Sequence, residues 1–248
     1  MAATLIRKVW LGVLLGVALL LAACGSGDDE PIVVLAASSL TDVLPPIAEA
    51  YEASTGRSVE LSFAGSSTLR EQILEGAPAS VFVSANPAIM AELTQVGLIV
   101  DTVVPVATNA IVIAVPTGNP ASVSGLESFG DPSAVLGLCA SEVPCGQLGE
   151  AVLASAGVTP QIDTFEPSVR SLLGKIELGE VDAGLVYETD VAASDSVELI
   201  GMPFTEDGQT IYVAARLRGS TDSAQDFVNF LDEPTAQSML LDAGFGFP

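Results

Sequence analysis

The feature that most constrains this sequence is a unit that occurs twice near its start. In each copy, an apolar run of strand length leads through uncharged hydroxyl residues into a helical pattern. In the first copy, residues 31–37 form a continuous apolar run, as expected for a parallel strand that is covered on both faces. Ser38 and Ser39 follow at once, and apolar residues then recur at helical spacing. Because Pro45 is tolerated only near the start of a helix, this helix is predicted to begin at residues 39–41.

The second copy runs from residue 59 to residue 74. A strand-like run leads to the hydroxyl residues Ser66, Ser67 and Thr68, and a helical pattern then begins. The free backbone N–H groups at the positive end of a helix, with short hydroxyls as extra donors, suit a small anion. The alternative is helix capping, because Thr68 and Glu71 fit a capping box. The occurrence of two copies favours the anion site.

Strand and helix patterns alternate through the rest of the chain, which predicts an α/β fold with mostly parallel sheets flanked by helices. Further strands are predicted at residues 80–84, 103–106, 110–115, 134–138, 183–187, 197–202 and 210–217, and further helices end near residues 97, 156, 178, 231 and 243. We expect two lobes, residues 31–108 with a return at 209–248, and residues 109–208. A ligand is expected in the cleft between them.

The N-terminal residues predict export and a lipid anchor. Two basic residues precede an apolar run that is too short for a comfortable membrane span, so residues 1–23 are predicted to be a signal peptide. The sequence Leu-Ala-Ala-Cys-Gly around Cys24 resembles a bacterial lipobox. This resemblance implies cleavage before Cys24, a diacylglycerol on its sulfur and tethering at the extracytoplasmic face of the cell membrane, with residues 24–30 as a linker. The alternative is an ordinary signal peptide with a chance cysteine.

Composition excludes several classes of function. The chain has 31 acidic and 8 basic residues and a formal net charge of −23 at pH 7, so its surface will not bind nucleic acid or anionic lipid by charge. It has no histidine, which excludes Ser-His-Asp catalysis and histidine-ligated metals. We therefore expect no catalytic residue and no direct protein ligand to a metal. Because the surface also repels anions at long range, an anion site must work by local geometry.

Two cysteines remain after Cys24. Cys139 and Cys145 lie six positions apart across a predicted loop. In an oxidising compartment an intraloop disulfide is the natural interpretation, and two free thiols are the alternative.

Short motifs that run in one order through most of the exported chain resemble those of the periplasmic molybdate-binding proteins, the receptors of molybdate ABC importers. The matching motifs are Ala36-Ala-Ser-Ser-Leu-Thr41, Phe63-Ala-Gly-Ser-Ser-Thr-Leu69, Gly76-Ala-Pro-Ala-Ser-Val-Phe-Val-Ser-Ala85, Val143-Pro-Cys-Gly146, Ser168-Val-Arg170 and Gly179-Glu-Val-Asp-Ala-Gly-Leu-Val-Tyr187. The resemblance implies a two-lobed periplasmic binding protein fold of type II, with the ligand in the cleft.

The resemblance also implies a set of binding residues. Ser39 and Ser66 align with two serines that bind the oxyanion through hydroxyl and amide, Cys145 and Val169 with two backbone amide donors, and Tyr187 with a hydroxyl donor. Ser38 and Ser67 are secondary candidates through their backbone groups, and Arg170 is expected to lie outside direct contact with the anion. Taken alone, Val169 and Tyr187 would be assigned to the core.

In function, the resemblance implies capture of molybdate, with tungstate expected to bind comparably, and delivery to the permease of an ABC importer by a monomeric receptor without a cofactor. A site made only of donors should refuse protonated anions such as phosphate, whereas selection against sulfate must depend on cavity size. The rival predictions are a receptor for sulfate or an organic acid, a hydrolase or phosphate-handling enzyme, and a lipid-tethered adhesion module. The absence of a Gly-x-Ser-x-Gly motif and of histidine argues against the enzyme.

Overall fold

The computed structural model describes residues 30–202 and 206–248, which form a mixed α/β fold. The strands lie in the order β2-β1-β3-β9-β4-β7-β5-β6, and β8 pairs with β4. The predicted signal peptide, Cys24 and all of the linker except Glu30 lie outside the described residues.

The strands are β1 (Ile32–Ala37), β2 (Val59–Ala64), β3 (Val81–Ser84), β4 (Val104–Pro116), β5 (Leu136–Cys139), β6 (Thr164–Glu166), β7 (Ala183–Tyr187), β8 (Val197–Ile200) and β9 (Gln209–Arg216). The α-helices are α2 (Leu44–Thr55), α3 (Ser66–Leu74), α4 (Pro87–Gln95), α5 (Pro144–Ser155), α6 (Val169–Glu177), α7 (Glu188–Ala192), α8 (Asp222–Phe230) and α9 (Pro234–Asp242). Short 3-10 helices are η1 (Ser38–Leu40), η2 (Leu126–Gly130) and η3 (Glu206–Gly208).

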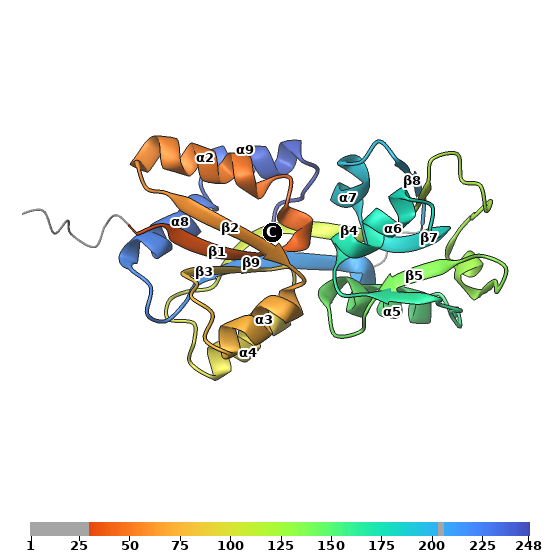
Figure 1. Cartoon of the computed structure of the whole chain (residues 1–248), viewed down its shortest axis with the longest axis horizontal. Coiled ribbons are helices and arrows are strands. Elements are labelled where there is room, and N and C mark those ends of the chain that lie inside the picture. Colours follow the sequence, from red (N-terminus) through yellow and green to blue (C-terminus); the bar gives the residue numbers. More distant parts are fainter. Residues whose placement is uncertain (1–29, 203–205) are drawn as a thin grey trace, which may run out of the picture. The chain divides into compact units, whose positions relative to one another are not determined.

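Strand β1 is the centre of the first group of strands. It pairs in parallel with β2 and β3, and β9 runs antiparallel beside β3. Helices α2, α8 and α9 cover one face of this group, and α3 and α4 cover the other (Figure 1). Successive side chains of a strand point to opposite faces, so Val34 belongs to the first cluster and Leu35 to the second. The unbroken apolar run of β1 therefore reflects burial on both faces.

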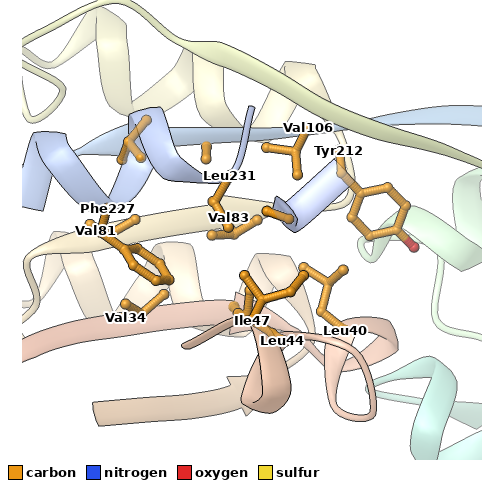
Figure 2. Close-up of a cluster of buried hydrophobic side chains, with 14 of the residues drawn as sticks. Val34, Leu40, Leu44, Ile47, Val81, Val83, Val106, Tyr212, Phe227 and Leu231 are labelled. Carbon is orange, nitrogen blue, oxygen red and sulfur yellow. The ribbon is translucent and has the colours of Figure 1, made fainter. Parts of the chain in front are cut away.

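The larger of these two clusters joins the strands to the helices above them. Val34 of β1, Val83 of β3, Ile47 of α2 and Phe227 of α8 pack together there, and all four side chains are fully buried (Figure 2). Burying a side chain of this size contributes about 1.5–3 kcal/mol to stability. The hydrophobic effect thus holds the two serine-bearing segments, which follow β1 and β2, against a rigid base.

A second group of strands has a core of its own. Strands β7, β5 and β6 are parallel, and β4 and β8 are antiparallel to the neighbours they pair with. Its cluster includes Phe129, Leu138 and Leu185, together with Leu153 of α5 and Leu172 of α6.

Strand β4 belongs to both groups. Its first half, as far as Ala110, pairs with β9, whereas the half that begins at Ile111 pairs with β7 and β8. The two separate strands predicted at residues 103–106 and 110–115 are therefore one continuous strand, because the polar residues between them lie on β4 where its partners change.

The helices that follow β1 and β2, at the two serine pairs, do not begin where two expectations from the sequence place them. Residues 38–40 form the 3-10 helix η1 and α2 begins only at Leu44, so the predicted α-helical start at residues 39–41 is wrong. Helix α3 begins at Ser66 with Gly65 as its N-cap residue. Thr68 therefore lies inside the helix, and the capping-box alternative is also wrong.

No helix in residues 30–202 or 206–248 is long and apolar enough to cross a membrane.

Two helical glycines provide a test of the packing at the start of α5. A Cβ on Gly146 would lie 2.0 Å from the carbonyl oxygen of Ala140, whereas a Cβ on Gly174 of α6 would have nothing within 4 Å. Gly146→Ala should therefore lower the free energy of unfolding by about 1–3 kcal/mol, because backbone must move to make room. Gly174→Ala should raise it by about 0.5–1 kcal/mol, since alanine is the better helix former. Urea unfolding of both variants measures this, and equal effects of the two substitutions would contradict the packing argument.

Candidate functional site

The candidate site is a pocket built from the starts of four helices. Its lining includes Ser38 and Ser39 of η1, Ser66 of α3, Cys145 of α5 and Val169 of α6. The pocket is too small for an organic ligand of ordinary size. Within the described part of the chain, every residue that lines it is uncharged.

Three of the residues that line the pocket stand at the starts of α-helices. Ser66 and Val169 are the first residues of α3 and α6, and Cys145 is the second residue of α5. The first N–H groups of an α-helix have no acceptor within the helix, so these amides are free to donate to a ligand. The positive ends of the helix dipoles favour negative charge at the same point.

The loop that carries the Cys145 amide is closed covalently. Cys139 ends β5, Cys145 lies in the first turn of α5, and their sulfurs form a disulfide, as the sequence predicts. Ser168 ends the neighbouring loop, where its hydroxyl accepts a hydrogen bond of 3.1 Å from the amide of Ser171 and so caps α6. Both loops are therefore held next to residues that line the pocket.

The hydroxyls of Ser39 and Ser66 are buried and already engaged with the protein. The Ser66 hydroxyl accepts a hydrogen bond of 3.1 Å from the amide of Ala85, which leaves its own proton free for a ligand. The Ser39 hydroxyl lies 2.7 Å from the hydroxyl of Tyr212.

Tyr187 supplies a hydroxyl without a partner. It ends β7, lines the pocket and is 1% exposed, and its hydroxyl oxygen has no hydrogen-bond partner among the described residues. Burial raises the pKa of this hydroxyl well above its ordinary value, and the nearby Tyr212 and Asp190 act in the same direction. The group therefore stays protonated and can donate.

Of the two secondary candidates, only Ser38 lines the pocket. Ser67 is absent from the lining within the described residues, and its hydroxyl donates instead to the carbonyl of Glu142 in the loop before α5. Seventy-five positions separate the two residues in sequence, so this bond ties α3 to a distant segment.

Arg170 follows Val169 in the sequence but is absent from the pocket lining in the described part of the chain. One guanidinium nitrogen pairs with Asp42, and Nε lies 3.0 Å from Oδ1 of Asp190, in an alignment that makes an ion pair but no hydrogen bond. The Asp190 side chain is fully buried, and its other oxygen accepts a hydrogen bond of 3.2 Å from the amide of Tyr187. The guanidinium group of Arg170 is thus engaged with two acidic side chains and is absent from the pocket lining in the described residues.

The described residues contain no group of three or more histidine, cysteine or acidic side chains arranged to hold a metal ion. The chemistry of the pocket is hydrogen-bond donation by uncharged groups. That arrangement suits an anion and offers no nucleophile-and-base pair among the residues that line it.

Comparison with known proteins agrees with this geometry. The family model described as "Bacterial extracellular solute-binding protein" matches residues 32–246. The chain belongs to this family. As an extracellular solute-binding protein, it acts outside the cytoplasm by binding a ligand and not by converting one. The molybdate-binding protein ModA of Mycobacterium tuberculosis is 31% identical to it over 96% of this chain and 99% of the relative.

Solved structures of solute-binding proteins share the fold, which is that of the type II periplasmic binding proteins. The molybdate-binding protein of Azotobacter vinelandii matches with a TM-score of 0.74 at 19% identity, over 88% of this chain and 99% of that one. The sulfate-binding protein SubI of Mycobacterium tuberculosis matches with a TM-score of 0.72 at 18% identity, over 87% of this chain and 86% of that one. The similar scores mean that the fold alone does not choose between the two anions.

Sequence reasoning missed several residues around the pocket of this solute-binding protein. A Cβ on Gly65 would lie 2.3 Å from the carbonyl oxygen of Pro167, so only glycine allows the start of α3 to approach the loop before α6. Gly65 lies in the motif Phe63-Ala-Gly-Ser-Ser-Thr-Leu69, so the sequence did contain a signal for this close approach. Tyr212 and Asp190 carry no local sequence signal, because each reaches the site from a distant or unpredicted element.

The buried Asp190 predicts an unusual pH dependence of stability. Burial raises its pKa to about 7, although the charge of Arg170 and the Tyr187 amide act in the opposite direction. The pKa of an aspartate in an unfolded chain is about 4. Between these values the folded state binds a proton that the unfolded state lacks, so this group lowers stability as the pH rises through that window. Asp190→Asn should remove this effect, worth on the order of 4 kcal/mol by about pH 7.

Urea unfolding at several pH values measures the difference between wild type and Asp190→Asn. The control is Asp131→Asn, because hydrogen bonds from Ser133 lower the pKa of this exposed aspartate. That group adds stability which is lost only as the pH falls below about 4, so its removal should change the profile in the opposite sense. Parallel profiles for wild type and Asp190→Asn would contradict the assignment.

Proposed function

We propose that this chain is the molybdate receptor of an ABC importer. The single observation that supports this most is the donor set: hydroxyls and helix-start amides converge on a small pocket whose lining is uncharged within the described residues. The ModA relative is named for molybdate binding and covers nearly the whole chain, which supports the choice of ligand.

Molybdate at neutral pH is a dianion that only accepts hydrogen bonds. In the proposed site its oxygens take bonds from the hydroxyls of Ser39, Ser66 and Tyr187 and from the amides of Cys145 and Val169. Each hydrogen bond to a charged group contributes about 1.5–3 kcal/mol, so such a set replaces the water of hydration without a counter-ion. Ser38 lines the pocket and stays a secondary member of the proposed set, whereas Ser67 is left out because it does not line the pocket within the described residues.

The same donor set explains selectivity. An anion that carries a proton, such as hydrogen phosphate, would bury an O–H group opposite donors only, and that O–H would lack an acceptor. Sulfate carries no proton, so its exclusion depends on the smaller size of the anion. Tungstate resembles molybdate in charge and size, and we propose that it binds comparably. A sulfate receptor remains the second candidate, because SubI has the same fold.

We propose two lobes, residues 31–108 with 209–248 and residues 109–208. The division of the hydrophobic clusters supports this, because two of them draw on residues up to Ala107 and from Tyr212 onward, and the third on residues from Ile111 to Val197. In such a protein β4 and β9 would form the hinge. The bonds from Ser67 to Glu142 and from Asn86 to Gln147 would then hold the closed form that a permease recognises.

Export, anchoring and partners complete the proposal. Residues 1–23 would be removed, and Cys24 would carry the lipid that keeps a monomeric receptor at the extracytoplasmic face of the membrane, next to its permease. Residues 24–30 would serve as the linker.

Calorimetric titration of the lipid-free protein with molybdate, tungstate and sulfate tests the ligand. Ser39→Ala and Ser66→Ala should each weaken molybdate binding by about 1–3 kcal/mol, because each removes a buried donor to a charged oxygen. Tyr187→Phe should have a similar effect. Val169→Ala is the control, since the amide remains and the affinity should barely change. Tight sulfate binding with weak molybdate binding, or equal damage from Val169→Ala and Ser39→Ala, would contradict the assignment.

The anchor is tested by Cys24→Ser in cells that express the full chain. The variant should lose metabolic labelling by a fatty acid and leave the detergent-rich phase on phase separation, because one acylated cysteine provides the membrane affinity. The double variant Cys139→Ser/Cys145→Ser keeps Cys24 and should remain lipid-labelled. Retention of label by Cys24→Ser would refute lipidation at this residue.

A further inference from the structure

Tyr212 has a place in the site that the sequence does not indicate. It lies on β9, and its ring packs against the core while its hydroxyl oxygen points away from the aliphatic side chains (Figure 2). The side chain is fully buried and is not among the pocket-lining residues of the described chain. Its hydroxyl instead lies 2.7 Å from the hydroxyl of Ser39, one of the proposed donors to the anion.

The direction of this hydrogen bond is set by Asn109. The Asn109 side-chain oxygen accepts a bond of 2.9 Å from the amide of Ala110, which fixes which end of the side chain is the NH₂ group. That NH₂ group donates to the Thr189 hydroxyl at 2.8 Å and to the Tyr212 hydroxyl in a longer contact of 3.4 Å. An NH₂ group only donates, so the Tyr212 oxygen is the acceptor in this contact.

These contacts determine which hydroxyl donates in the hydrogen bond between Tyr212 and Ser39. Of the two partners that the described residues give the Tyr212 hydroxyl, only the Ser39 oxygen can accept its proton. Ser39 therefore accepts from Tyr212, and its own proton is left to point into the pocket. Burial raises the pKa of the Tyr212 hydroxyl above its ordinary value, so the proton is not lost near neutral pH.

We propose that Tyr212 is a specificity-determining positioning residue, which keeps Ser39 a hydrogen-bond donor and so excludes tetrahedral oxyanions that carry a proton. The inference rests on the proposed function, because it concerns the same pocket. A serine hydroxyl is both donor and acceptor, so without Tyr212 it can turn and accept the O–H of a protonated anion. Tyr212 makes the Ser39 hydroxyl a donor only. Asn109 holds Tyr212 in that role from β4, close to the point where this strand changes its pairing partner from β9 to β7.

The experiment compares sulfate with hydrogen phosphate, two tetrahedral anions of similar size that differ by one proton. Their affinities are measured by competition against molybdate at a pH where phosphate is monoprotonated. Tyr212→Phe keeps the ring and its edge-on contact with Phe245, whose centroid lies 5.5 Å away, and removes only the hydroxyl. The affinity for phosphate relative to sulfate should rise about tenfold, as expected for one hydrogen bond regained at a buried O–H.

Two further variants test whether the change in the phosphate-to-sulfate ratio comes from the orientation of the Ser39 hydroxyl. In a Ser39→Ala background, Tyr212→Phe should no longer change the phosphate-to-sulfate ratio, because Tyr212 acts through Ser39. Tyr51→Phe is the matched control, because Tyr51 is also buried and its ring packs against Phe227. Its hydroxyl donates a hydrogen bond of 3.3 Å to the Ser223 carbonyl, and Tyr51 does not line the pocket in the described residues. It should leave the ratio unchanged.

Equal weakening of sulfate and phosphate by Tyr212→Phe would overturn the proposal, since a purely structural role affects both anions alike. If Tyr212→Phe fails to fold, Asn109→Ala tests the same series of hydrogen bonds, because it removes the donor to the Tyr212 hydroxyl. It should also raise the phosphate-to-sulfate ratio, and an unchanged ratio in this variant overturns the proposal.

The molybdate titration of the wild type separates this inference from the proposed function. If the wild type prefers sulfate to molybdate, the proposed function fails, while the phosphate-to-sulfate ratio still decides the role of Tyr212. If it binds none of the three anions, both fail.

Discussion

An anion site without a counter-ion depends on donors that are fixed before the ligand arrives. A hydroxyl or amide that has to turn toward the anion loses part of its advantage over water, because water turns freely. In this protein two of the proposed donors are held by other groups: the Ser66 hydroxyl by the amide of Ala85, and the Cys145 amide by a helix start and a disulfide. The hydrophobic clusters beneath the two serine-bearing segments make that fixation possible, since they prevent β1 and β2 from shifting.

The parts of this arrangement that are local in sequence could be predicted. The serines after β1 and β2 follow from a repeated pattern of apolar run, hydroxyl residues and helix, and the disulfide follows from two cysteines on one loop. Local patterns also misled where two local structures compete. Residues Ser38–Leu40 form the 3-10 helix η1, and α2 begins only at Leu44, because Pro45 and Pro46 can stand only in the first turn of an α-helix.

The parts that depend on residues far apart in the chain could not be predicted. Tyr212 reaches Ser39 across 173 positions, and Ser67 reaches Glu142 across 75, and no pattern within either segment points to its partner. The case of Ser67 is instructive, because it is adjacent to Ser66 and identical in type. The geometry of the first turn of α3 sends one hydroxyl toward the Ala85 amide and the other toward a neighbouring loop. Neighbouring serines in one motif therefore have different roles.

The charge of the whole molecule explains why fixation and closure matter so much here. With a formal net charge of −23, the protein repels an approaching dianion over roughly one Debye length, about 8 Å at physiological ionic strength. Such repulsion lowers the association rate, the reverse of electrostatic steering. Tight binding then requires slow dissociation. Fixed donors slow it by making each lost bond costly, and contacts such as Asn86 to Gln147, at 2.9 Å, would slow it by keeping the two segments together over the proposed ligand. Because the acidic surface opposes binding at long range, selectivity and retention at the proposed site would have to come from short-range geometry alone.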